Sequence, residues 1–340
     1  MHTHALNPNE VRFFSGRSHP KLAEDIASFL DVPLSPTYVS KFSNDNLYIQ
    51  LGSSVRGRNV YIVQSLVPPV SDHLMELFMM LDIARGAGAR EVHAIIPYFS
   101  YARSDKKDAP RISITARLIA DMLTTAGATH IMTMTLHSPQ AHGFFSVPTD
   151  PLTARHLFYY FYQKRNLDPA DTIVISPDLG RAKPAARFAK QLGLPIVAAT
   201  KHRVSDIEVI FDDTIEKQVP GYRRALIYDD EIATGTTVIE LSKQLVCAGI
   251  TEIHAICTHG IFAGQALKNI TTFPEIRRII STDTVPLTKR SRKLTVLSVA
   301  PIFGEAIWRN YNRQSIGDLF YYGDDHIKGS LDLDDLIVPD

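Results

Sequence analysis

The sequence predicts an α/β protein made of two doubly wound domains with mainly parallel central sheets. The chain has 340 residues, of which 45% are hydrophobic and 21% charged, and this length and composition suit two buried cores. Segments typical of strands and helices alternate along it, and this alternation occurs twice. The strand candidates include continuous apolar runs such as Ala225–Tyr228, which is typical of strands buried on both faces of a parallel sheet.

The first domain is predicted to span residues 1–150. Apolar residues recur at helical spacing in three segments, and the polar turn Ser43–Asn46 predicts a hairpin within Lys41–Leu51. The expected strands are Val11–Gly16 with its turn, Val60–Gln64, Glu91–Phe99 and Thr129–Leu136, and the expected helices are Pro20–Leu30, Asp72–Arg85 and Ile112–Ala126. The proline-bearing segment Phe144–Pro151 is expected to be irregular and to mark the domain boundary.

The second domain is predicted to span residues 151–310, and residues 311–340 form an extension with a polar, acidic tail. The same alternation of periodicities indicates its elements. The expected strands are Thr172–Ser176, Pro195–Thr200, Ala225–Tyr228, Glu252–Thr258, Arg278–Ser281 and Leu294–Val299, and the expected helices are Thr153–Lys164, Pro184–Leu192, one that begins at Val238, and Ile302–Tyr311.

Composition narrows the classes of function. Lys plus Arg equals Asp plus Glu, 36 each, so no overall field favours nucleic acid or a membrane surface as a partner. No apolar run approaches membrane-spanning length, and the first residues lack the pattern of a signal peptide. The two cysteines, Cys247 and Cys257, offer no disulfide framework. We therefore expect a cytoplasmic protein.

The stretch Arg224–Val238 carries the most specific signal. An apolar strand is followed by the adjacent carboxylates Asp229 and Asp230, and then by a threonine-glycine turn before a helix. Such a turn offers backbone N–H groups and hydroxyls to a phosphate. The acidic pair suits sugar hydroxyls or a divalent cation instead. The pattern predicts a site for a phosphorylated sugar with Mg²⁺, although the pair alone is also compatible with a solvated helix start.

Polar segments follow other strands too. A segment rich in Arg and Lys, Ser100–Arg111, interleaves cations with tyrosines, which suits either a nucleotide or a solvated surface. His137 follows the strand Thr129–Leu136, and a histidine there is either a ligand or a structural residue. Since no Ser-His-Asp set, cysteine site, dinucleotide fingerprint or Walker loop competes, the predicted reaction is transfer of a phosphate group from a nucleotide to a sugar phosphate.

The chain resembles the ribose-phosphate pyrophosphokinase, or phosphoribosyl pyrophosphate (PRPP) synthetase, family over nearly all of residues 11–320, with a fold of phosphoribosyltransferase type. The matching stretches include Lys41–Asn46, Ser54–Ser65, Ile96–Lys107, Leu136–Phe145, Ser176–Lys183, Lys201–Arg203, Asp229–Thr237, Ser281–Leu287 and Leu297–Ile307.

The resemblance implies that the β,γ-diphosphoryl group of ATP is transferred to the 1-hydroxyl of ribose 5-phosphate, with Mg²⁺ as cofactor. It implies catalytic roles for Lys201 and Arg203 and metal-binding roles for His137 and Asp178. The implied ATP-binding residues are Phe42, Asn44, Asn46, Arg103, Ser104, Asp105 and His137. The implied ribose-phosphate residues are Asp229, Asp230, Ala233, Thr234, Gly235, Thr236 and Thr237, and the diphosphate loop is Asp178, Leu179, Gly180, Arg181 and Lys183. The implied assembly is a homo-oligomer built from dimers, with a hexamer as one candidate, in which a neighbouring subunit supplies part of the ATP site.

Five positions depart from the family pattern. Asn46 stands where an acidic residue is common, Ser104 where glutamine is common, and Thr135 and Ala233 each replace an aspartate. Arg181 replaces the second glycine of the diphosphate turn, where it either narrows the pocket or adds a cation. The first two departures leave ATP, another nucleotide or ADP open as the donor.

Two alternative functions remain beside the synthetase. A regulatory homologue would keep the fold without catalysis, and a phosphoribosyltransferase would consume PRPP. Intact Lys201, Arg203, His137 and Asp178 argue against the first. The nucleotide segment and the Lys201–Arg203 loop argue against the second.

Overall fold

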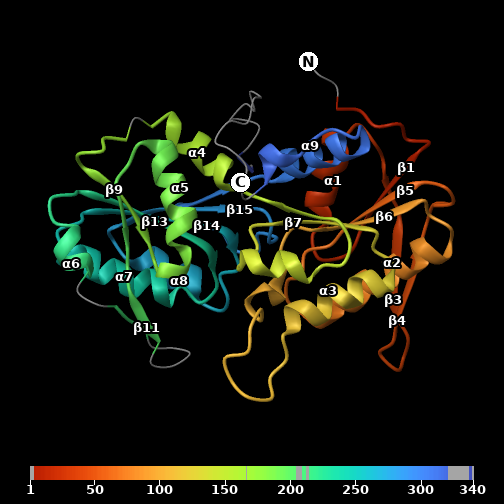
Figure 1. Ribbon diagram of the computed structural model, residues 1–340, viewed down its shortest axis with the longest axis horizontal. Coiled ribbons are helices and arrows are strands. Elements are labelled where there is room, and N and C mark those ends of the chain that lie inside the picture. The colour runs from red at the N-terminus through yellow and green to blue at the C-terminus, as the bar shows by residue number, and fades with distance from the viewer. Residues whose placement is uncertain (1–3, 166, 204–208, 212–213, 321–336, 339–340) are drawn as a thin grey trace. The chain divides into compact units, whose positions relative to one another are not determined.

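The computed structural model describes residues 4–165, 167–203, 209–211, 214–320 and 337–338, without the side chains of 201–203, 209–211 and 214. The described residues fall into two compact units. Unit 1 holds residues 4–153, 284–286 and 299–320, and unit 2 holds those of 154–283, 287–298 and 337–338. Both units are α/β structures (Figure 1).

The described part of unit 1 is built on a parallel sheet of six strands in the order β2-β1-β5-β6-β7-β8. Its strands are β1 (Val11–Ser15), β2 (Leu34–Ser35), β5 (Asn59–Val63), β6 (Glu91–Ile96), β7 (His130–Met134) and β8 (Thr149–Leu152). A separate antiparallel hairpin pairs β3 (Thr37–Lys41) with β4 (Leu47–Leu51), as the polar turn predicted.

Helices cover both faces of this sheet (Figure 1). They are α1 (Pro20–Phe29), α2 (Val70–Gly86), α3 (Thr115–Ala126) and α9 (Ala300–Tyr311), with short 3₁₀ turns η1 (Ser100–Arg103), η2 (Pro139–Phe144) and η4 (Gly317–Leu319). α1 packs against α9, and α2 against α3. The sequence explains where α1 begins: Pro20 occupies its first position, and the His19 side chain accepts a hydrogen bond from the Leu22 backbone N–H at 3.3 Å.

Unit 2 repeats the arrangement, with the described strands in the parallel order β10-β9-β13-β14-β15-β16. Its strands are β9 (Thr172–Ser176), β10 (Ile196–Ala198), β13 (Arg224–Ile232), β14 (Glu252–Gly260), β15 (Ile276–Thr282) and β16 (Leu294–Leu297), and β11 (Lys201–Arg203) pairs with β12 (Val209–Phe211) as an antiparallel ribbon. Its helices are α4 (Arg155–Gln163), α5 (Ala182–Leu192), α6 (Thr214–Gln218), α7 (Thr236–Cys247) and α8 (Ala266–Thr272), with the 3₁₀ turn η3 (Leu179–Arg181). Two parallel, doubly wound sheets confirm the predicted fold class.

The buried cores follow the apolar patterns of the sequence. In unit 1, Leu77 and Leu81 of α2 pack with Val60 and Ile62 of β5, all fully buried. In unit 2, Ala225 and Ile227 of β13 lie in a cluster with Leu241 and Leu245 of α7. Burial of this kind supplies most of the free energy that holds sheets and helices together.

Several boundaries differ from the sequence-based expectations, and three of the differences have a clear physical reason. β8 covers the end of the segment expected to be irregular and continues to Leu152, and it tolerates Pro151 because it is the edge strand of the sheet. α3 begins at Thr115 rather than Ile112, since Ile114 has a ψ of 80°, outside the helical region. β13 runs on to Ile232 because β14 is equally long and pairs with it to the end.

The helix α9 lies with unit 1, whereas the sequence placed residues 151–310 in one domain. Its contact with α1 explains the grouping. At the closest point Gly304 faces Phe29, and any side chain at position 304 would overlap the Phe29 ring. The small residue lets α9 approach α1.

Candidate active site

The strand order of unit 2 places its candidate site at the carboxyl ends of β9 and β13. From β9 the chain goes to β10 on one side, and β13 occupies the other side. Open α/β sheets bind ligands at such a switch in strand order, because the loops leave in opposite directions and open a crevice. The segments that follow β9 and end β13 are the predicted diphosphate loop and the predicted sugar-phosphate stretch.

The acidic pair lies inside β13, beyond the end of its shorter neighbour. The last paired residues of β13 and β9 are Ile227 and Ile175, whereas on the other side Asp229 is still paired with Cys257 of β14. The backbone N–H of Asp230 donates a hydrogen bond to Asp229 Oδ1 at 2.8 Å. Asp230 is buried, with 6% of its surface exposed, and Asp229 is half-buried. Asp229 and Asp230 thus lie past the point where β13 stops pairing with β9.

The predicted diphosphate loop forms a tight turn directly after β9. Asp178 caps the turn η3, and its Oδ1 accepts a hydrogen bond from the Arg181 backbone N–H at 3.0 Å. Ser176 Oγ donates to the Asp178 carbonyl oxygen at 2.8 Å. Leu179 and Gly180 are exposed at the tip of the turn, and Lys183 is exposed on the first turn of α5.

A buried ion pair joins this turn to β13. Arg181 Nη2 lies 2.6 Å from Asp230 Oδ2, and the two side chains are only 7% and 6% exposed. Charge-assisted hydrogen bonds of this length are among the stronger polar contacts in proteins. The pair fixes the turn and the acidic strand end relative to each other within unit 2.

The stretch Ala233–Thr237 forms the expected turn into a helix. Gly235 is the N-terminal cap residue of α7 and has a φ of 78°, a conformation that glycine adopts without strain. Ala233 is tied to the segment after β14 through a hydrogen bond from the Ala263 backbone N–H to its carbonyl oxygen at 2.9 Å. Thr234 Oγ1 and Thr236 Oγ1 lie 3.2 Å apart, and Thr237 is half-buried. A helix N-terminus with hydroxyls beside it is suited to an anion such as phosphate.

The predicted nucleotide residues lie on three segments of unit 1. Phe42, Asn44 and Asn46 form the exposed tip of the β3–β4 hairpin, where the Phe42 backbone N–H donates to the Asn46 carbonyl oxygen at 2.9 Å. An ion pair of 3.2 Å between Lys41 and Asp72 connects the base of this tip to α2.

The other nucleotide candidates follow two neighbouring strands of the same sheet. Arg103 ends η1 and is exposed, and Ser104 and Asp105, both half-buried, come next. His137 is half-buried and follows β7. Because β6 and β7 are adjacent parallel strands, the Arg103–Asp105 segment and His137 leave the same edge of the sheet.

The catalytic candidates Lys201 and Arg203 lie in β11, which pairs with β12 through Lys201–Phe211 and Arg203–Val209. Their side chains are outside what the structure describes. The backbone therefore places them on an antiparallel ribbon between β10 and α6, and their contacts stay a prediction.

The corresponding switch in strand order of unit 1, between β1 and β5, is filled by protein. Gln64 is fully buried there, its Oε1 accepts from the Ser18 backbone N–H at 3.0 Å, and its Nε2 donates to the His73 carbonyl oxygen at 3.0 Å. A side chain at Gly16 would overlap the Gln64 amide. This glutamine directly follows β5, the neighbour of β1, whereas in unit 2 the acidic pair lies on β13, the neighbour of β9.

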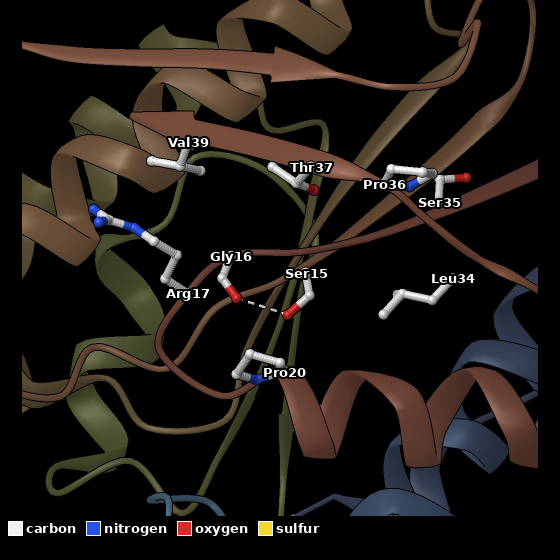
Figure 2. A pocket seen from close by; sticks show the side chains of 9 residues that line it. All are labelled: Ser15, Gly16, Arg17, Pro20, Leu34, Ser35, Pro36, Thr37 and Val39. Carbon is white, nitrogen blue, oxygen red and sulfur yellow. Dashed lines mark hydrogen bonds between the residues drawn. The ribbon is translucent and has the colours of Figure 1, made fainter. Parts of the chain in front are cut away.

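A hollow of about 280 Å³ lies beside that point in unit 1 (Figure 2). Figure 2 shows Ser15, Gly16 and Pro20 along one side of it and Pro36, Thr37 and Val39 along another. Arg17 at its rim is paired with the buried Glu76, 2.9 Å from Nε to Oε2. The lining is mainly apolar and contains none of the predicted site residues.

Cys257 on β14 is paired with Asp229, so its thiol is the nearest alternative nucleophile at the unit 2 site. Burial raises the pKa of the Cys257 thiol, and the carboxylates of Asp229 and Asp230 raise it further, so this cysteine stays a neutral thiol rather than a nucleophile. Within the described residues, no three His, Cys, Asp or Glu side chains come together as a metal-binding group.

None of the helices described has the length and apolar character needed to cross a bilayer.

The sequence identified both loops at the unit 2 switch but not the contact between them. It flagged Arg181 as a departure that either narrows the pocket or adds a cation, and the structure shows its guanidinium on Asp230. The sequence shows Arg181 next to a glycine in the turn, but Asp230, which this arginine contacts, is 49 residues further along the chain. Only the pairing of β9 with β13 brings the two together.

Known proteins resemble the chain over nearly its whole length. A family model described as the N-terminal domain of ribose phosphate pyrophosphokinase matches residues 11–127, and one described as the phosphoribosyl synthetase-associated domain matches residues 212–321. A Streptomyces coelicolor protein is 48% identical over 92% of this chain and 98% of its own. The ribose-phosphate pyrophosphokinases of Deinococcus radiodurans and Wolinella succinogenes are 42% and 40% identical, over 90% and 91% of this chain and 97% and 98% of theirs.

A solved structure supports the same relation. The crystal structure of phosphoribosylpyrophosphate synthetase from Mycobacterium smegmatis is 34% identical and superposes with a TM-score of 0.81. The match covers 89% of this chain and 99% of that one.

Proposed function

Because the chain belongs to the ribose-phosphate pyrophosphokinase family of enzymes, we propose that it transfers the β,γ-diphosphoryl group of ATP to the 1-hydroxyl of ribose 5-phosphate. The products are PRPP and AMP. The sugar O1 forms a bond to the β-phosphorus, and the bond from that phosphorus to the oxygen bridging the α and β positions breaks. The hydroxyl proton passes to solvent and AMP leaves with the bridging oxygen.

The observation that carries this proposal is the arrangement at the unit 2 switch. An acidic pair, Asp229 and Asp230, and a helix-capping turn, Ala233–Thr237, follow each other on one strand and loop. The carboxylates suit the sugar hydroxyls, whereas the turn suits the 5-phosphate. The diphosphate loop is attached to the same strand end through the 2.6 Å contact of Arg181 with Asp230.

Catalysis in this class of reaction consists mostly of positioning and of stabilising charge. Lys201 and Arg203 would supply positive charge to the migrating diphosphoryl group, with Arg203 able to hold phosphate oxygens in a bidentate manner. Lys183 and the backbone N–H groups of the Asp178–Arg181 turn would add to the diphosphate site. Both segments would thus place positive charge beside the diphosphoryl group. During the transfer, negative charge develops on the oxygen that leaves with AMP, and nearby cations stabilise the polyphosphate.

For the nucleotide, we propose a site formed by Phe42, Asn44, Asn46, Arg103, Ser104, Asp105 and His137. The exposed Phe42 ring, 58% exposed, offers a stacking surface for a base, and Arg103 offers a cation for phosphate. ATP is the proposed donor. Asn46 and Ser104 are the residues that would set the choice among nucleotides.

We further propose that the protein forms a homo-oligomer in which a neighbouring subunit completes the nucleotide site. We also propose that it works in the cytoplasm, where the free thiols of Cys247 and Cys257 are stable.

Mg²⁺ is the proposed cofactor. It binds hard oxygen ligands and is usually held by one or two carboxylates together with substrate phosphates rather than by a complete protein cage. Asp178, with its carboxylate at the diphosphate turn, fits that chemistry, and His137 is the second candidate. When bound, Mg²⁺ would neutralise charge on the polyphosphate.

Two variants, one of them doubly substituted, separate sugar binding from group transfer in this proposal. Asp229→Asn with Asp230→Asn should raise the KM for ribose 5-phosphate about tenfold or more, with a much smaller change for ATP, because hydroxyl donors lose charged acceptors. Lys201→Ala should lower kcat roughly a hundredfold or more and leave the unfolding curve unchanged. Steady-state kinetics with each substrate varied, and circular dichroism of each variant, measure both.

Lys243→Ala is the matched control, since Lys243 is exposed on α7 and pairs with Glu240 on the same helix. It should leave kcat and both KM values unchanged. An unaltered KM for ribose 5-phosphate in the doubly substituted protein would contradict the proposed sugar site.

A further inference from the structure

The Arg181–Asp230 ion pair is unusual in its burial. Both side chains are more than nine-tenths buried, and the two atoms are 2.6 Å apart. Removing two charges from water carries a large free-energy cost, and the attraction between them often only offsets this cost. A buried pair is therefore weak evidence for stability and better evidence for a fixed arrangement of charge.

The pair also connects two functional segments through one residue. The backbone N–H of Arg181 is held by Asp178 Oδ1 at 3.0 Å, and its guanidinium is held by Asp230 Oδ2. The turn after β9 and the end of β13 are thus linked at both the backbone and the side chain of Arg181. A small residue at position 181 would keep the first contact and lose the second.

The charge balance of the site depends on this contact. Asp229 and Asp230 are adjacent and lie just before the turn that would take a phosphate. Two unneutralised carboxylates would repel a phosphate dianion, and they would do so strongly where burial reduces screening. The Arg181 guanidinium offsets one of these charges inside the protein, while a carboxylate can accept about four hydrogen bonds in all.

From these observations, and resting on the proposed function, we propose that Arg181 is a positioning residue for sugar binding. It neutralises Asp230 and fixes the direction of its carboxylate, so that Asp230 accepts a hydroxyl of ribose 5-phosphate without repelling the 5-phosphate. Arg181 acts through Asp230 rather than by touching the sugar.

A double-mutant cycle of Arg181→Gln and Asp230→Asn tests this assignment, with binding of ribose 5-phosphate to the full chain measured by calorimetry without nucleotide. Arg181→Gln should weaken binding about tenfold or more in the wild-type background. In the Asp230→Asn background the same substitution should change affinity little, because its effect passes through the missing charge. Arg181→Lys should restore part of the affinity, since it keeps the charge but not the fork geometry.

Stability is measured alongside by chemical denaturation. Arg181→Gln alone leaves the buried carboxylate of Asp230 without a countercharge and should lower the denaturant concentration at the unfolding midpoint. Adding Asp230→Asn removes that buried charge and should restore the midpoint. If Arg181→Gln does not fold, the comparison of wild type with Arg181→Lys still decides, because the proposal requires weaker binding by the lysine variant. Lys190→Gln, at an exposed position of α5, is the control and should match the wild type in both measurements.

Three outcomes would overturn the proposal. Unchanged or tighter binding by Arg181→Gln would make the arginine a bystander or an obstruction, and equal losses in both backgrounds would mean that it contacts the sugar directly. Wild-type affinity in Arg181→Lys would remove the need for the fixed geometry. Failure of the wild type itself to bind ribose 5-phosphate would instead count against the proposed function.

Discussion

At Gly235 the backbone turns with a φ of 78° and begins α7, and a Cβ there would lie 2.7 Å from Ile270 Cδ1 of α8. Two features of this position require glycine: the positive φ and the close approach to Ile270. The turn before α7 can lie against α8 because nothing larger than hydrogen occupies this position. A single residue thus sets the shape of the proposed cradle.

Gly235→Ala should therefore destabilise the protein by about 2–4 kcal/mol, the sum of left-handed strain and steric overlap. Gly193→Ala is the matched control, since Gly193 has a φ of 68° but no atom within 4 Å of its Cβ position, and it should cost only about 1 kcal/mol. Chemical denaturation of both variants measures the difference. Equal losses in the two proteins would show that Ile270 does not limit the turn.

The residues of the proposed site differ in how well the sequence predicted them. Asp229, Asp230 and Gly235 follow each other locally, so an apolar run, an acidic pair and a glycine turn identified them directly. The partner of Arg181 depends on which strands become neighbours, and local pattern carries no such information. The ion pair with Asp230 was consequently found only in the structure.

At the scale of elements, unequal strand lengths shape the proposed site. The sequence predicted β13 as a short apolar strand with the acidic pair after it, whereas the strand continues to Ile232 along β14. β9 ends earlier, at Ser176, and its turn occupies the level of the acidic pair. Apolar periodicity cannot reveal this extension, because polar residues continue the strand once a long neighbour satisfies their backbone groups. The same limit hid the edge strand β8.

The amino end of β14 carries a charged cluster that should make stability depend on pH. Burial disfavours the charged form of Glu252, but hydrogen bonds from Arg224 at 3.2 Å and Arg223 at 2.9 Å outweigh it and lower its pKa to about 2. Burial lowers the pKa of His254 to about 4, against the raising effect of Glu252. His254 also contacts the Tyr162 hydroxyl at 2.9 Å.

The lowered pKa values of His254 and Glu252 both make the folded protein less stable as the pH falls. The unfolded chain binds a proton at His254 near pH 6.5 while the folded protein resists it until about pH 4, so stability falls as pH decreases through that window. The contribution of Glu252 is lost further down, between about pH 4.5 and 2. His254→Gln should remove the first loss, about 2–3 kcal/mol of relative stability between pH 6.5 and 4. Parallel curves of unfolding free energy against pH for the two proteins would refute this.

At the scale of the whole molecule, the chain uses the same doubly wound arrangement twice, with different residues at the switch in strand order. In unit 1 the switch in strand order is filled by Gln64 and its hydrogen bonds, and the nucleotide candidates lie instead on a hairpin and on the loops after β6 and β7. In unit 2 the switch carries the acidic pair and the turn before α7. Alternating periodicities predicted this class of fold, since each strand and helix buries an apolar face. They could not predict that α9 would pack on α1, which depends on the close contact at Gly304.

The most direct test of the central claim is phosphorus NMR of the purified protein with ATP, ribose 5-phosphate and Mg²⁺. The proposed reaction predicts AMP and a sugar that carries a diphosphate ester at C1, formed in equal amounts. ADP with a sugar monophosphate ester at C1, inorganic phosphate as the nucleotide-derived product, or no product from folded protein would each contradict it.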